Sequence, residues 1–306
     1  MLLMIAPERE AIAQSCFATA TNVNFGTLSV NAVANATTTG NINEGCTAGY
    51  PTNGTLQLCN HIGAGSNSAS QTNRTMKSGT NVLAYQLYRD AARTTIFTYP
   101  GTSPIAIPYS SSGGGSTNTP VYARITGTSA GLPPGTYTDA YSTRSQTLAT
   151  FDSLPPRNVC SLSSSWVSAV PTFTVTATLA ASCAVTATNM TFPTSGVLNA
   201  AKDTSSNLTV TCTSTTPYNV GLSAGTGAGA TTALRRMTGS GGATVGYTLY
   251  RDASRTQLWG TTIGSDTIAG TGTGSAQALT VYGRVPAQST PAPGLYQDVI
   301  NVTVTY

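Results

Sequence analysis

The chain contains the same segment twice. Residues 85–94 read YQLYRDAART and residues 247–256 read YTLYRDASRT, 162 positions later. Further features recur in the same order at offsets of 159 to 167 positions: Cys16 and Cys183, Cys46 and Cys212, Val121-Tyr122 and Val281-Tyr282, and Gly135 to Asp139 and Gly294 to Asp298. A repeat of this length is typical of a duplicated domain rather than of a solenoid. We therefore expect two copies of one domain.

Composition predicts that both copies are built from strands. Charged residues make up only 8% of the 306 residues, against roughly 25% in ordinary soluble proteins. Long amphipathic helices need Glu, Lys, Arg and Leu, whereas Thr, Val and Tyr favour strands and Gly, Pro, Asn and Ser favour turns. Short alternating segments between turn residues are typical of a sandwich. The expected fold class is all-β.

Several function classes are disfavoured. The net charge of +4 rests on 14 Lys and Arg without a basic block, so nucleic acid is not an expected partner. The one histidine, His61, and the lack of CxxC or CxxH pairs leave little basis for catalysis, a cofactor or a metal. Asp90 and Asp252 lie in the repeated Tyr-Arg-Asp segment, where capping a turn is more typical than acid–base chemistry. We do not expect an enzyme.

The six cysteines indicate three disulfides in an oxidising compartment. Cys183 and Cys212 are the one pair in copy two, and the repeat then pairs Cys16 with Cys46 in copy one. Cys59 and Cys160 remain and are paired by elimination. At the N-terminus, Ala11-Ile12-Ala13 resembles a cleavage site, so residues 1–13 are read as the remainder of an export signal, with the mature chain starting near Gln14.

An extra strand is expected between the copies. In residues 172–181, alternation places Phe173, Val175, Ala177 and Leu179 on one face. No matching segment precedes Cys16 in a chain that starts near Gln14. Two alternatives remain open. Residues 172–181 can be the first strand of copy two, or residues 158–170, with Val159, Trp166, Val167 and Val170, can complete copy one instead.

The motifs resemble a known family. Each copy has an early cysteine followed by Phe25-Gly26 or Phe192-Pro193, then Leu-Tyr-Arg-Asp, then a Gly-x-Tyr-x-Asp strand, and the chain ends in a Tyr. Together they resemble the spore coat protein U domain, the pilin-type domain of archaic chaperone–usher pili. This resemblance implies two tandem incomplete immunoglobulin-like sandwiches, each completed by a donor strand through β-strand addition. A two-domain member resembles the tip adhesin of such a fibre.

The resemblance implies partners and a location. The partners are the adjacent pilus subunit, a periplasmic chaperone, an outer-membrane usher, and an abiotic or host surface. The chain is exported through the periplasm to the cell surface, where the fibre mediates adhesion and biofilm formation. A static spore or envelope coat protein is the alternative, and neighbouring chaperone and usher genes would decide between the two.

Domain assignments follow from these expectations. Residues 14–171 form an N-terminal adhesin domain and residues 172–306 a C-terminal pilin domain, of which 172–181 act as donor strand to the first domain. The alternating end of the chain places Val302, Val304 and Tyr306 on one face beside an open acceptor groove. A subunit that accepts a strand and has none to donate belongs at the end of a fibre.

Copy one carries the candidate adhesive loops. Apolar residues in loops of a fibre's free end suggest contact with hydrophobic surfaces. The expected contact residues are Phe97, Tyr99, Ile105, Ile107, Tyr109, Leu132 and Pro133. They can instead fold back onto the sandwich. A carbohydrate ligand stacked on Tyr99, Tyr109 or Trp166 is the second possibility.

Overall fold

The computed structural model describes residues 15–47, 54–110, 114–152, 160, 162 and 167–306. Their regular structure is β-strand apart from one short 3-10 turn, Ser240–Gly242, which confirms the all-β prediction. No helix in this part of the chain is long and apolar enough to cross a membrane. The chain divides into two compact units. Unit 1 contains the described residues up to Thr27 and those within Ala34–Thr128 and Thr136–Thr178, and unit 2 contains Leu28–Val33, Ser129–Gly135 and Leu179–Tyr306.

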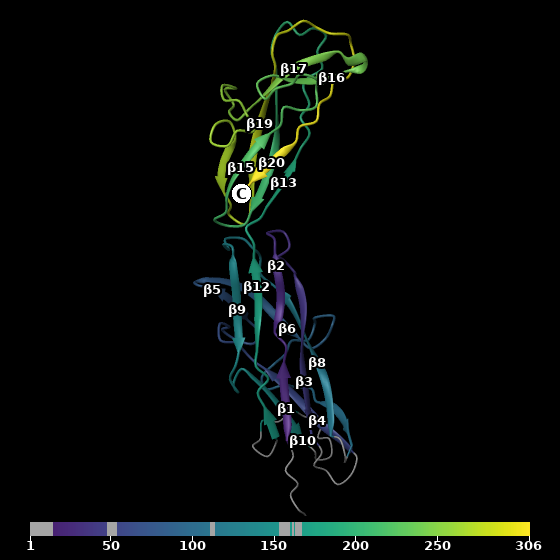
Figure 1. Ribbon diagram of the computed structural model, residues 1–306, viewed down its shortest axis with the longest axis vertical. Helices are drawn as coiled ribbons and strands as arrows, with labels where there is room; N and C mark the ends of the chain where they lie inside the picture. The colour runs from purple at the N-terminus through teal and green to yellow at the C-terminus, as the bar shows by residue number, and fades with distance from the viewer. Residues whose placement is uncertain (1–14, 48–53, 111–113, 153–159, 161, 163–166) are drawn as a thin grey trace, which may run out of the picture. The chain divides into compact units, whose positions relative to one another are not determined.

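Unit 1 contains a large and a small sheet (Figure 1). The strands of the large sheet are, in order across it, β1 (Cys16–Ala20), β3 (Thr37–Cys46), β8 (Gly115–Ile125), β6 (Asn81–Tyr88), β5 (Arg74–Ser78), β9 (Gly135–Tyr141), β12 (Phe173–Leu179) and β2 (Val23–Leu28). The strands of the small sheet are β11 (Val167–Ala169), β10 (Thr147–Asp152), β4 (Gly54–Ile62) and β7 (Ile105–Tyr109).

Period-two patterning forms these strands and their core. Along β8, Val121, Ala123 and Ile125 are buried while the residues between them are half-exposed, as expected when successive side chains point to opposite faces. One cluster of buried residues in unit 1 comprises Cys46, Leu56, Leu58, Ile107, Ala149 and Phe151. The three disulfides are those predicted, Cys16–Cys46, Cys59–Cys160 and Cys183–Cys212.

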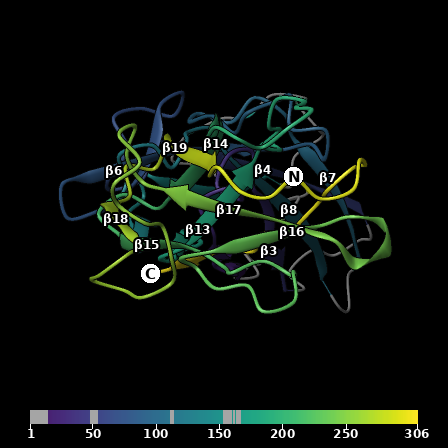
Figure 2. The ribbon, with the colours of Figure 1, turned by 90° about the horizontal axis from the view of Figure 1, so that it is seen from above.

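Unit 2 repeats this arrangement with fewer strands. The strands of its larger sheet are β13 (Cys183–Ala187), β14 (Lys202–Cys212), β19 (Ala276–Val285), β17 (Thr244–Tyr250) and β16 (Arg235–Thr238). In the smaller sheet, β15 (Pro217–Leu222) lies between β18 (Ile268–Thr271) and β20 (Val302–Thr305), and Figure 2 shows β15 beside β18. The core of unit 2 is a separate cluster around Trp259, Val210 and Val220.

A buried arginine shows how closely the two units correspond. The Arg74 guanidinium donates to the carbonyl oxygens of Ile62, Gly63 and Phe97. Arg235 donates to those of Leu222, Ser223 and Trp259. Equivalent bonds identify equivalent residues, so positions in one copy can be compared with positions in the other. Both side chains are fully buried, and their bonds satisfy carbonyls where the β4 and β15 strands end.

Candidate functional site

The predicted strand 172–181 lies inside the large sheet of unit 1. It forms β12, which is hydrogen-bonded between β9 and β2 (Figure 1). The Asn22 side chain accepts from the Thr174 N–H, and the Leu28 carbonyl accepts from the Ala180 N–H, so β12 runs parallel to β2. Phe173 stacks on Tyr141, and Thr178 contacts Thr136, so β12 runs antiparallel to β9.

The alternating face of β12 is fully enclosed. Phe173, Val175, Ala177 and Leu179 are all buried. The Phe173 ring lies parallel to the Tyr141 ring with centroids 4.5 Å apart. Burying Val, Leu or Phe contributes roughly 1.5–3 kcal/mol each, and pairing on both sides satisfies the backbone of β9 and β2. β12 is therefore a strand of the large sheet of unit 1 and of neither sheet of unit 2. Of the alternative segment 158–170, Val167–Ala169 form β11 on the edge of the small sheet.

Unit 2 has the same place in its fold without a strand in it. Its larger sheet ends at β16, whereas the equivalent sheet of unit 1 continues from β5 through β9 and β12 to β2. Residues 188–198 and 295–301, which correspond to β2 and β9, form no strand apart from one bridge between Thr238 and Gln297. The stretch 167–306 is described throughout, and nothing in it lies between these two segments as a strand. We call the space between them the strand seat of unit 2.

The residues that border β12 in unit 1 are more deeply buried than the equivalent residues that border the strand seat of unit 2. In unit 1, Val23, Phe25, Tyr137 and Tyr141 are buried. In unit 2, the equivalent residues Met190, Phe192, Tyr296 and Ile300 are only partly buried, although they pack against the core. Large apolar side chains of unit 2 are exposed along these segments and at the chain end: Val197 57%, Leu295 74%, Val299 62% and Tyr306 59%. The apolar floor of the seat is thus present in unit 2, and its cover is missing.

The polar part of the floor is built in both copies. In unit 1, the Asp139 carboxylate accepts from the Asn67 N–H at 2.7 Å and from the Tyr85 hydroxyl at 2.6 Å. In unit 2, the Asp298 carboxylate accepts from the Thr226 N–H at 2.7 Å and from the Tyr247 hydroxyl at 2.8 Å. These bonds therefore form in unit 2 without a covering strand.

The chain end forms a shorter strand than its alternation predicts, and this strand lies in the smaller sheet. The strand at the alternating chain end, β20, begins at Val302 and ends at Thr305, one residue before the expected Tyr306. Val302 and Val304 are half-buried and pack against the core, and β20 pairs with β15. Tyr306 is exposed, whereas its equivalent Phe151 is buried. The equivalent strand of unit 1, β10, also begins at the equivalent position, because Thr147 pairs with Ile62 as Val302 pairs with Leu222.

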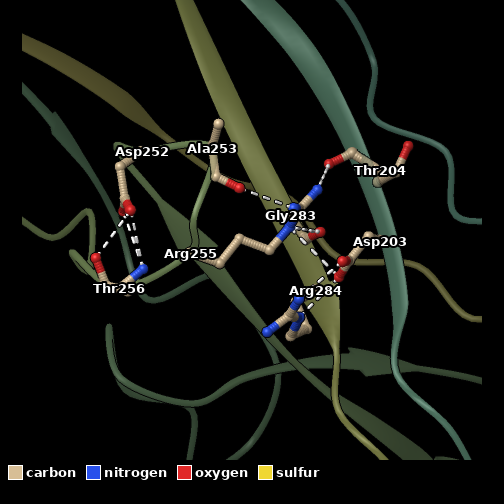
Figure 3. Close-up of polar contacts among 8 residues, drawn as sticks. All are labelled: Asp203, Thr204, Asp252, Ala253, Arg255, Thr256, Gly283 and Arg284. Carbon is tan, nitrogen blue, oxygen red and sulfur yellow. Dashed lines mark hydrogen bonds and ion pairs between the residues drawn. The ribbon is translucent and has the colours of Figure 1, made fainter.

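The repeated Asp-x-x-Arg segments are turns. Asp252 accepts from the N–H groups of Thr256 and Gln257. Figure 3 shows the bond from Thr256 and the contacts of Arg255 with the carbonyls of Ala253, Gly283 and Thr204. Asp203 forms ion pairs with Arg255 and Arg284.

In unit 1, Asp90 accepts from Thr94 and Thr95, whose N–H groups lower the pKa of the Asp90 carboxyl to about 2. Arg93 and Arg255 both have positive φ, near 57° and 58°. The same closed geometry in both copies marks these aspartates as turn caps.

The seven predicted adhesion residues separate into two groups. Phe97, Ile107 and Leu132 are buried, so their expected exposure is wrong. Ile107 alternates inward on β7, opposite Leu56 on β4. Tyr99, Ile105, Tyr109 and Pro133 are half-buried. Trp166, Val159 and residues 1–13, including the start near Gln14, lie outside the described residues.

Two buried titratable groups occupy the core of unit 1. His61 is buried: its Nδ1 accepts from the Gly101 N–H at 2.7 Å, and its Nε2 contacts the Thr150 hydroxyl at 2.9 Å. Burial lowers the pKa of His61 to about 4. Glu44 was not identified from the sequence as a buried residue. Burial raises the pKa of its carboxyl to about 7, although the hydrogen bonds from Thr119 and Asn60 lower it. Among the described residues, no cluster of His, Cys, Asp and Glu is arranged to hold a metal.

Comparisons with known proteins agree with this architecture. The model of the Spore Coat Protein U domain family matches residues 5–143 and again residues 169–303. A solved chain from the CsuC–CsuE chaperone–tip adhesion subunit complex of archaic Csu pili of Acinetobacter baumannii is similar in fold, with a TM-score of 0.56, 15% identity and coverage of 95% of this chain and 100% of the other. The CupB6 tip adhesin of Pseudomonas aeruginosa aligns over 97% of this chain and 95% of its own at 11% identity, with a TM-score of 0.34. No curated protein matches.

The fold defines a class of protein: tandem pilin-type β-sandwiches. Within this class, the chain belongs to the Spore Coat Protein U domain family and contains two copies of its domain.

Proposed function

We propose that this protein is an adhesive tip subunit of a surface pilus, exported through the periplasm and held in the fibre by its unit 2. Unit 1 keeps its own seat filled with β12 and is the part that meets an abiotic or host surface. The seat of unit 2 receives a donor strand from the adjacent subunit. Adhesion of this kind serves attachment and biofilm formation.

One observation carries the proposal. Equivalent apolar residues are buried in unit 1 under β12 and left partly exposed in unit 2. An edge with unpaired backbone groups beside exposed apolar side chains is a site for strand addition. The occupant is expected to resemble β12, an extended segment with alternating apolar residues. During export, a periplasmic chaperone would cover the seat until an outer-membrane usher exchanges it for the subunit strand.

The adhesive surface is assigned to the half-buried side chains that remain of the predicted loops. Tyr99, Ile105 and Tyr109 lie on or near β7 in unit 1, whereas Pro133 belongs to a segment of unit 2 and is left out of this surface. Half-buried aromatic and aliphatic side chains provide contact area while their position stays fixed by the core. Ile107 is excluded because its substitution would disrupt the core of unit 1.

A substitution in the seat tests the assembly role. In the bacterium that makes the fibre, Ile300→Asp is expected to abolish incorporation, because a carboxylate on the apolar floor opposes an inserted strand. Ile263→Asp is the matched control, since Ile263 is 56% exposed and outside the two segments that border the seat. Immunogold labelling should find the wild type and Ile263→Asp at fibre ends and not Ile300→Asp. Normal incorporation of secreted Ile300→Asp would reject the role of the seat.

A further inference from the structure

A carboxylate holds two arginines together on the surface of unit 2. One oxygen of Asp203 on β14 lies 2.7 Å from Nε of Arg284 on β19 and 3.3 Å from Nε of Arg255 in the repeated turn (Figure 3). The other oxygen accepts from Nη2 of Arg284 at 2.8 Å, so this pair is bidentate. Asp203 and Arg284 are directly opposite each other on neighbouring strands, where opposite charges stabilise a sheet.

Unit 1 has the same two arginines without the carboxylate. By the repeat, Arg93 corresponds to the turn arginine and Arg124 to the strand arginine. The position opposite Arg124 on β3, which Asp203 occupies in unit 2, is Thr37. In the part of the chain that the structure describes, neither Arg93 nor Arg124 forms an ion pair. Thr37 is exposed and both arginines are half-buried, so the missing partner would lie at the surface.

The turn arginine is held in the same way in both copies. Arg93 donates from Nε to the Ala123 carbonyl at 3.2 Å and from Nη1 to the Ala91 carbonyl at 3.0 Å. Arg255 makes the equivalent bonds at 3.3 and 3.0 Å. The Arg93 guanidinium lies 5.7 Å from the ring centroid of Tyr122, and Arg255 lies 5.8 Å from the equivalent tyrosine ring. Arg93 therefore holds its guanidinium where Arg255 holds it beside the carboxylate.

The strand arginine has an unused donor. The Arg124 guanidinium lies 5.3 Å from the Tyr88 ring centroid, and its Nη2 donates to the Tyr88 hydroxyl at 3.0 Å. Arg124 Nε is covered and has no hydrogen-bond partner among the described residues, whereas Asp203 accepts from the equivalent Nε of Arg284. A buried N–H without an acceptor is costly. Because Nε is covered here, Arg124 must turn away from Tyr88 to form the bidentate pair of unit 2, and the pair would give this N–H its acceptor.

We propose that Arg93 and Arg124 bind a carboxylate from another molecule, the side chain of a glutamate or aspartate in an acidic peptide segment. The carboxylate would lie beside Thr37, pair with Arg124 through two bonds and meet Arg93 on its other side. A protein carboxylate is the expected source because an aspartate side chain fills this place in unit 2.

The position of the site sets what the segment must offer. An ion pair at a half-exposed site is weak, so the segment is expected to present several carboxylates, which raise the local concentration at the arginines. The site belongs to unit 1 and uses no residue that borders the strand seat of unit 2. Either site can therefore fail without the other.

The test is an NMR titration of the full chain, followed through the Nε–H resonances of its arginines. A peptide of six glutamates with blocked ends should shift those of Arg93 and Arg124 saturably. It should leave those of Arg255 and Arg284 in place, because Asp203 occupies their site. A peptide of six glutamines should cause no saturable shift. Acetate should bind at least ~tenfold more weakly than the glutamate peptide, because it presents a single carboxylate.

Exchanging the residue between the two arginines should move the site from one copy to the other. Thr37→Asp supplies an internal carboxylate and should abolish the response of the arginine pair in unit 1. Asp203→Thr removes the internal carboxylate of unit 2 and should make Arg255 and Arg284 respond as well. Both substituted positions are exposed, so neither variant is expected to unfold its unit.

Arg144→Gln is the matched control for charge, because Arg144 is exposed in unit 1 and forms no ion pair in the described ranges. It should bind the glutamate peptide as the wild type does, whereas Arg124→Gln should bind it ~fivefold more weakly. Four results would each overturn the proposal. They are no saturable shift of Arg93 and Arg124, equal binding of the glutamine peptide or of acetate, an unchanged response in Thr37→Asp, and equal losses in Arg144→Gln and Arg124→Gln.

Discussion

Val175→Asp is expected to unfold unit 1 while leaving unit 2 folded. Val175 is fully buried at the centre of β12, between β9 and β2. A carboxylate at this position must be desolvated without a partner or must leave the sheet, and either costs about 4 kcal/mol or more. If β12 leaves, β9 and β2 lose their common neighbour, and Tyr141 loses its stacking on Phe173.

Hydrogen exchange on the full chain measures this effect. Val175→Asp should remove protection from residues 23–28 and 135–141 and leave 202–212 protected, since β14 belongs to unit 2. Thr176→Asp is the matched control, because Thr176 lies on the other, half-exposed face of the same strand. Full protection of β2 and β9 in Val175→Asp would show that β12 does not complete unit 1.

Glu44→Gln is expected to change how the stability of unit 1 depends on pH. The Glu44 pKa rises from 4.5 in the unfolded chain to about 7, so its contribution is fully present below pH 4.5 and is lost as the pH rises to 7. The His61 pKa falls from 6.5 to about 4, so its contribution is present above pH 6.5 and is lost as the pH falls to 4. Each shift corresponds to roughly 3 kcal/mol.

These two dependences have opposite sign and overlap between pH 4.5 and 6.5. The wild type should therefore show a nearly flat free energy of unfolding across this window. Glu44→Gln removes one contribution, and unit 1 should then lose roughly 2–3 kcal/mol between pH 6.5 and 4.5 because His61 acts alone. His61→Gln should show the reverse slope, with stability falling as the pH rises.

Urea titrations at fixed pH, followed by oxidation of methionine, separate the units. Met76 is fully buried in unit 1 and reports its unfolding, while Met237 packs against the core of unit 2 and serves as the internal control. Parallel pH profiles for the wild type and Glu44→Gln would contradict the assigned pKa of Glu44. If Glu44→Gln changed only the urea midpoint reported by Met237, the placement of Glu44 in unit 1 would be contradicted.

The internal repeat and the period-two pattern predicted most of the architecture. Two copies of one cysteine spacing predicted two sandwiches and the equivalent disulfides Cys16–Cys46 and Cys183–Cys212, because a duplicated domain keeps its covalent framework. Elimination then left Cys59–Cys160 as the third pair. The alternation of Phe173, Val175, Ala177 and Leu179 predicted which face of β12 is buried. The local sequence pattern was sufficient here, because successive side chains in a strand point to opposite faces of the sheet.

Long-range packing decided what the sequence left open. Phe97 and Ile107 lie near polar loop residues and were expected to be exposed, but β7 pairs with β4 and turns Ile107 inward. Glu44 lies between Ile42 and Cys46 on the inward face of β3. Its place in this alternation could have indicated from the sequence that it is buried. Comparison with Val210 in copy two was a second signal. Its partners Asn60 and Thr119 come from distant strands, which no local pattern connects.

The most direct test of the open seat is hydrogen exchange on the full chain with and without a peptide of residues 171–182. Without peptide, residues 188–198 and 295–301 should exchange rapidly, unlike the equivalent β2 and β9. With peptide at 100 times its dissociation constant, these segments should gain protection and unit 2 about 2.7 kcal/mol of stability. A peptide with Asp at the positions of Val175 and Ala177 should have no effect. Segments already protected in the free chain, and unchanged by the peptide, would show that unit 2 is closed and contradict the account.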